Sequence, residues 1–199
     1  CRGQNSCNDA TINALLSTGN FEIDCQSTNS CRYIQIYGSM QEINPNTQAS
    51  NQIPQFNVNC NKNQRSCAES TINCPTHSDC TVSCNNRNSC KSALIVSPQQ
   101  NNLTVNCMDD QSCLETIIDG KDASQLYING CSKSQSCSEL SVYCPANTNG
   151  HKNCHIQGNE NLERLSLYAE NGWKDIQMDY NGSFTNTTEN GALYCASNY

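Results

Sequence analysis

The stretch CNNRNSCKSALIVSPQQNNLTVN, residues 84–106, is followed directly by CMDDQSCLETIIDGKDASQLYIN, residues 107–129. Both segments open with two cysteines six positions apart, carry serine before the second cysteine, and continue with two short runs of alternating apolar residues. This plan returns about every 24 residues, which indicates one structural unit repeated along an axis. The opening pairs are Cys1/Cys7, Cys25/Cys31, Cys60/Cys67, Cys84/Cys90, Cys107/Cys113 and Cys131/Cys137.

The apolar residues of each unit alternate with period two. The middle member of the first run gives the set Ile12, Ile36, Ile72, Ile95, Ile118, Val142 and Leu167, and pairs such as Phe56/Val58 precede the next unit. Such alternation marks strands with one buried face, and equivalent strands of successive units run in the same direction. The sequence therefore predicts an all-β fold, a right-handed parallel β-helix of about seven rungs of about 24 residues. Its hand follows from the rule for parallel crossovers.

The repeat also sets the expected domain organisation. Residues 1–180 form one elongated domain, whose seventh rung lacks cysteines. The polar segment between Gly38 and Phe56 interrupts the period and is expected to project as a loop. Periodicity stops at residues 181–199, which are expected to be either a C-terminal cap or a mobile tail.

Composition restricts the partners and the compartment. The net charge is −7 and no basic stripe is present, so neither nucleic acid nor anionic lipid is expected as a partner. The longest apolar run, residues 93–96, is too short for a membrane span. Seventeen cysteines indicate an oxidising compartment. Sequons at Asn102, Asn181 and Asn186 predict N-linked glycans on a secreted, extracellular or cell-surface protein. The start at a cysteine leads us to expect a processed form or an excised fragment.

Eight disulfides within single rungs are predicted, with a ladder of bonds between rungs as the rival arrangement. Cys74 and Cys144 support closure within a rung, because neighbouring units carry no cysteine at the equivalent positions. Cys195 is left without a partner and is a candidate for an intermolecular bond. The predicted pairs are Cys1–Cys7, Cys25–Cys31, Cys60–Cys67, Cys74–Cys80, Cys84–Cys90, Cys107–Cys113, Cys131–Cys137 and Cys144–Cys154.

Three groups of side chains are candidates for chemistry. His151 and His155 have a spacing that suits zinc, but a surface loop explains them better. Asp109 and Asp110 are adjacent carboxylates of the kind that flank a glycosidic bond, yet they fall on a corner where successive side chains diverge. The serine before each second cysteine is interpreted as a structural partner of local backbone. No catalytic residue, metal or cofactor is expected.

The segments CQSTNSC, CNNRNSC, CMDDQSC and CSKSQSC, followed by strands such as ALIV and ETIID, carry a family resemblance. The chain resembles right-handed parallel β-helix proteins of pectate-lyase-like architecture, and more closely the cysteine-stapled β-helix repeat proteins of protist secretomes. For the larger group the resemblance implies polysaccharide cleavage. The Asn-Thr-Asp, Gly-His-Gly and Arg-Ile-Lys motifs of polygalacturonases are absent, so no catalytic residue is carried over.

Three function classes follow. The preferred hypothesis is a structural extracellular glycoprotein that is not an enzyme and self-associates head to tail into a filament, appendage or surface coat. Its expected contacts are the sheet edge of the Cys1 rung and the tail Gly191–Tyr199 of the adjacent subunit. The alternative is a carbohydrate- or surface-binding adhesin that uses tyrosines such as Tyr37 or Tyr143. A glycan-active enzyme is the third class.

Overall fold

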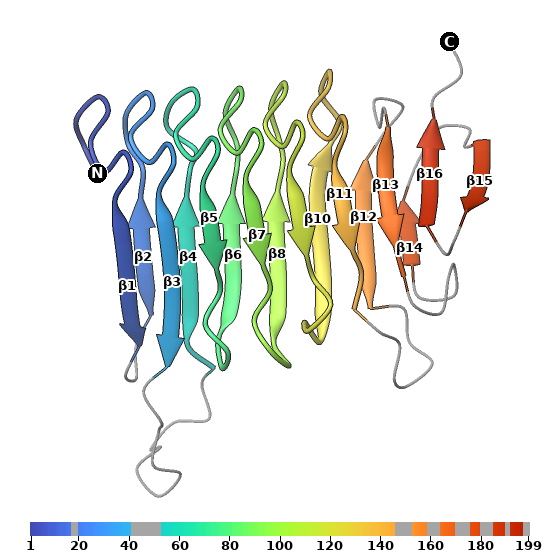
Figure 1. Cartoon of the computed structure of the whole chain (residues 1–199), viewed down its shortest axis with the longest axis horizontal. Coiled ribbons are helices and arrows are strands. Elements are labelled where there is room, and N and C mark those ends of the chain that lie inside the picture. Colours follow the sequence, from blue (N-terminus) through green and yellow to red (C-terminus); the bar gives the residue numbers. More distant parts are fainter. Residues whose placement is uncertain are drawn as a thin grey trace, which may run out of the picture.

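The computed structural model describes residues 1–16, 20–40, 53–145, 153–158, 164–169, 176–179, 185–189 and 192–196. In this part of the chain all regular structure is β, and the strands form a nine-stranded and a seven-stranded sheet wound about one long axis (Figure 1). The nine-stranded sheet contains β1 (Thr11–Leu16), β3 (Gln35–Met40), β5 (Thr71–Asn73), β7 (Leu94–Val96), β9 (Ile117–Asp119), β11 (Ser141–Tyr143), β13 (Leu165–Tyr168), β16 (Ala192–Ala196) and β15 (Thr185–Glu189). The seven-stranded sheet contains β2 (Phe21–Asp24), β4 (Gln55–Asn59), β6 (Asp79–Ser83), β8 (Asn102–Asn106), β10 (Gln125–Cys131), β12 (Cys154–Gly158) and β14 (Ile176–Asp179).

The predicted fold class, an all-β parallel solenoid, is confirmed. Odd-numbered strands pair in parallel from β1 to β13, and even-numbered strands pair in parallel from β2 to β14. About five turns, from β3/β4 to β11/β12, have a parallel neighbour on both sides in both sheets. This is fewer than the expected seven, because β1/β2 and β13/β14 are end turns with such a neighbour on one side only. The right-handed sense of winding stays a prediction.

The register places the predicted apolar residues in continuous interior columns. Ile12, Ile36, Ile72, Ile95, Ile118, Val142 and Leu167 stack directly, and all but Ile12 have no solvent exposure. In the other sheet one buried column begins at Ile23 and continues through Val58, and a second begins at Phe56. Burial alternates along the strands, as in β4 and β8, because successive side chains point to opposite faces. Each strand therefore sends only its inward-facing side chains to the core, which is a narrow stack along the axis.

The C-terminal segment pairs within its own chain, whereas the sequence led us to expect contact with an adjacent subunit. β16 pairs antiparallel with β13 of its own chain, with Leu167 opposite Leu193, and β15 pairs antiparallel with β16. These two strands, residues 185–189 and 192–196, continue the nine-stranded sheet beyond β13, and we call them the cap. The expected side loop lies mostly in residues 41–52, outside the described residues.

Candidate functional site

The third side of six turns is a compact corner held by a disulfide. Eight bonds join Cys1–Cys7, Cys25–Cys31, Cys60–Cys67, Cys74–Cys80, Cys84–Cys90, Cys107–Cys113, Cys131–Cys137 and Cys144–Cys154. Each bond closes its own turn, and the Cα atoms of the pairs lie 5.4 to 5.9 Å apart. Six of the bonds belong to the repeat and define what we term the stapled corner, residues 1–9, 25–33, 60–69, 84–92, 107–115 and 131–139.

The stapled corner has a repeated left-handed backbone that sequence reasoning missed. Residues two places before and two places after the second cysteine have φ between 54° and 58°. The first column contains Asn5, Asn29, Arg65, Asn88, Gln111 and Gln135; the second contains Asp9, Tyr33, Glu69, Ser92, Glu115 and Glu139. Asparagine is the side chain that tolerates this conformation best after glycine, which explains its frequency in the first column. Its recurrence at a fixed offset was the available signal.

The serine column has the structural role predicted for it. Ser30, Ser66, Ser89, Ser112 and Ser136 have no solvent exposure. Ser66 Oγ donates to the carbonyl of Cys60 at 2.7 Å, and Ser136 Oγ donates to the carbonyl of Lys133 at 3.0 Å. Ser30 Oγ accepts the backbone N–H of Ser27 at 3.2 Å. These three hydroxyls satisfy local backbone groups at a tight bend, which is the role predicted for the column. Ser112 Oγ is buried as well but has no hydrogen-bond partner among the described residues.

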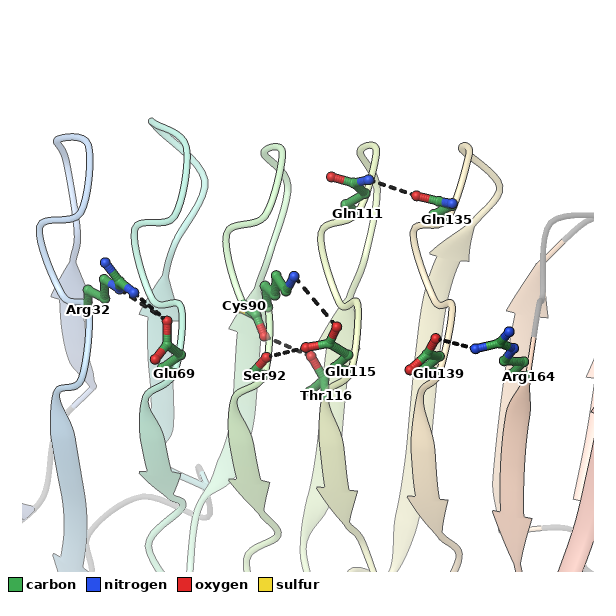
Figure 2. Close-up of polar contacts among 11 residues, drawn as sticks. Arg32, Glu69, Cys90, Ser92, Gln111, Glu115, Thr116, Gln135, Glu139 and Arg164 are labelled. Carbon is green, nitrogen blue, oxygen red and sulfur yellow. Dashed lines mark hydrogen bonds and ion pairs between the residues drawn. The ribbon is translucent and has the colours of Figure 1, made fainter.

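Polar side chains connect neighbouring corners along the axis (Figure 2). Arg32 Nη2 lies 2.6 Å from Glu69 Oε1 in the next turn, and Arg164 Nη1 lies 2.7 Å from Glu139 Oε1. Glu115 accepts a hydrogen bond from Ser92 Oγ at 2.7 Å and pairs with Lys91 at 3.5 Å. Gln111 Nε2 donates to Gln135 Oε1 at 2.7 Å. Neighbouring turns are thus connected by polar contacts on the exposed surface of the corners as well as by packing in the core.

Electrostatic shifts at this corner follow from the same pairs. The hydrogen bond from Arg32 lowers the pKa of Glu69, and the hydrogen bond to Glu69 raises the pKa of Arg32. On the seven-stranded sheet the hydrogen bond from Gln26 lowers the pKa of Asp24. Each shift favours the charged form, which is typical of surface ion pairs and does not prepare a group for proton transfer at neutral pH.

The side chains that were candidates for chemistry do not come together in the structure. The ring of His155 stacks on Tyr127 with centroids 4.8 Å apart, and His151 lies outside the described residues. Asp110 pairs with Arg87 at 3.4 Å, while Asp109 Oδ1 accepts the backbone N–H of Asp110. Neither group forms a convergent site with other described residues.

One cluster of sulfur atoms has the spacing of a metal site. The Sγ atoms of Cys25, Cys60 and Cys67 lie within 4.8 Å of one another, and Cys67 Sγ is 3.5 Å from Cys25 Sγ. All three belong to two stacked disulfides, so no thiolate is available there as a ligand. The closeness reflects the spacing of the turns.

Two of the three glycosylation candidates are described, one on the seven-stranded sheet and one in the cap. Asn102 opens β8, is partly exposed, and accepts a hydrogen bond from Ser124 Oγ at 2.9 Å. Asn186 belongs to β15, and Asn181 lies outside the described residues. Cys195 belongs to β16 and stands opposite Leu165. Glycans at the three asparagines and a bridge at Cys195 stay predictions.

Five described side chains at the N-terminal end of the solenoid are only partly covered. Cys1, Cys7, Ala10, Ile12 and Phe21 pack on the core but are only partly buried; we call them the open end. Their counterparts one turn later, Cys25, Cys31, Ile34, Ile36 and Phe56, have no solvent exposure. Within the described residues no strand lies beyond β1 or β2. Among the described residues, the apolar interior is therefore incompletely covered at this end.

Comparison with protein-family models, with curated proteins and with solved structures found no match.

Proposed function

We propose that the protein is a structural extracellular glycoprotein whose copies stack head to tail into a filament, appendage or surface coat. The observation that carries this proposal is the open end, where the interior columns of a stiff solenoid terminate in partly exposed Ile12 and Phe21. Apolar surface and unpaired strand edges favour coverage by another chain. A second copy supplies stacked turns of the same width, and repetition of one heterologous contact produces an open fibre.

The remaining features fit a secreted structural subunit. Eight disulfides replace the large hydrophobic core that a narrow solenoid lacks, and they persist in oxidising compartments. None of the described residues forms a helix that could cross a membrane. We place the chain with the cysteine-stapled β-helix proteins of protist secretomes on the strength of its repeat. N-linked glycans at Asn102, Asn181 and Asn186 belong to the same proposal, and intact glycopeptide mass spectrometry of secreted protein tests them.

Electron microscopy and light scattering of the full chain over a range of concentrations test the assembly. We expect filaments from the wild-type protein, and fewer from Ile12→Lys because a charge at the open end opposes burial. Ile117→Lys, at an exposed position of β9 in the middle of the same sheet, is the matched control and should assemble like the wild type. A wild-type protein that stays monomeric at every concentration would exclude the proposal.

A carbohydrate-binding adhesin is the second candidate. Tyr37 on the outer face of the nine-stranded sheet is 42% exposed, and its hydroxyl donates to Gln35 Oε1 at 3.1 Å. An exposed ring beside amide groups offers both stacking and hydrogen bonds. Tyr143 and Tyr168 are less suited, because their rings stack on each other with centroids 4.5 Å apart. Glycan-array binding by monomers that is lost in Tyr37→Ala would favour this function over assembly.

A further inference from the structure

The two edge strands of the nine-stranded sheet run in the same direction. β1 to β13 are parallel to one another, β16 is antiparallel to β13, and β15 is antiparallel to β16. Two reversals restore the original direction, so β15 runs parallel to β1, as the arrows in Figure 1 show. A copy translated along the axis therefore brings its β1 beside β15 in the parallel orientation used throughout the solenoid.

The backbone groups of β1 are arranged for such an addition. In later turns the N–H groups of Gln35, Thr71 and Leu94 donate to carbonyls of the preceding turn. Thr11 is the register equivalent of Gln35, so its N–H and C=O face the side on which no described strand lies. The N–H and C=O groups of successive residues point to alternate sides of a strand, so those of Asn13 face the same side as those of Thr11. The edge of β1 thus presents donors and acceptors that a parallel strand can satisfy.

We propose that β1 of one copy adds to β15 of the preceding copy, so that the nine-stranded sheet continues through each junction. This inference rests on the head-to-tail assembly proposed above and names its interface. It assigns the contact to residues 185–189, because residues 192–196 are already paired with β13 of their own chain. The partner of β1 is a second copy of this chain, and the binding mode is strand addition.

The junction has a defined asymmetry. β16 and β15 extend the nine-stranded sheet past β13, whereas the seven-stranded sheet ends at β14. Two additional strands correspond to about 10 Å at the usual strand separation. In the proposed junction the nine-stranded sheet alone is continuous, so strand pairing covers Ile12 on β1, whereas Phe21 on β2 lies about that distance from the described end of the neighbouring seven-stranded sheet.

Proline substitution at the β1 edge tests this interface in the full-length chain. Asn13→Pro removes an N–H that faces the proposed partner and leaves the groups that pair with β3, because proline is tolerated at a sheet edge. Loss of a strand hydrogen bond and the added ring should raise the critical concentration for filament growth about tenfold or more. Asn13→Ala retains the N–H and should assemble like the wild type. Circular dichroism and melting temperature establish that both variants are folded.

Hydrogen exchange on wild-type filaments gives an independent measurement if Asn13→Pro fails to fold. Residues 11–16 and 185–189 should gain protection together when monomers assemble. Filaments of folded Asn13→Pro that grow like the wild type, or protection gained at residues 11–16 without residues 185–189, would overturn strand addition and leave head-to-tail assembly standing. A wild-type protein that never assembles would overturn both.

Discussion

At the scale of single residues, Gly120 lies where successive turns approach each other closely. A Cβ atom on Gly120 would lie 2.9 Å from the carbonyl oxygen of Tyr143 and 2.7 Å from Cδ2 of Leu126. We expect Gly120→Ala to lower the free energy of unfolding by about 1–3 kcal/mol through overpacking. Urea denaturation without reductant measures the change. Ser97→Ala, at the equivalent position one turn earlier, should cost less than about 1 kcal/mol, and equal losses would contradict the steric explanation.

Glu69 links stability to pH. Its pKa is lowered in the folded state by the hydrogen bond from Arg32, so the pair contributes stability above the ordinary glutamate pKa of about 4.3. That contribution disappears as the pH falls through the lowered value. For an exposed pair we expect about 0.5 kcal/mol. Thermal melts of wild type and Glu69→Gln should differ at pH 7 and converge at pH 2. Glu22→Gln provides the control. A difference in melting temperature between wild type and Glu69→Gln that persists at pH 2 would contradict this explanation.

At the scale of elements, the strands were predictable because burial follows period two in each unit. The interior column from Ile36 to Val142 required only the offset from the second cysteine. The left-handed corners were not predicted, because residues such as Glu69 and Tyr33 have no intrinsic preference for positive φ and adopt it under tertiary constraint. The pair Arg32–Glu69 was also missed, since the inserted loop separates its members by 37 residues.

Removal of one disulfide from the middle of the solenoid measures how much that bond contributes to the free energy of unfolding. Cys107 and Cys113 close a corner flanked by disulfide-bonded corners on both sides. Replacing both by alanine should lower the free energy of unfolding by about 2 kcal/mol, the chain-entropy value for so short a loop. Chemical denaturation of the oxidised proteins measures it. Full loss of the β-sheet circular dichroism signal in this variant would show that the corner requires every staple.

At the scale of the whole molecule, the solenoid has two different ends. Its N-terminal turn exposes core residues, whereas β16 and β15 cover β13. The sequence left the choice between cap and mobile tail open, because residues 181–199 have no repeat from which register could be read. The pairing of Leu193 with Leu167 is a tertiary contact between the C-terminal segment and the last turn, and no repeat in the sequence marks it. Sequence periodicity specifies the turns, and tertiary pairing specifies how the stack ends.

Removal of residues 181–199 tests whether the stability of this stack is local. Each turn contacts its neighbours only, so loss of the cap should raise amide exchange at residues 165–168, which pair with β16. The effect should weaken at β11 and vanish by β5, five strand positions along the sheet from β16. Hydrogen exchange with mass spectrometry, compared between the full-length and shortened chains under oxidising conditions, resolves this gradient. A uniform rise in exchange from β1 to β13 would show that the solenoid unfolds as one cooperative unit and that the cap stabilises all of it.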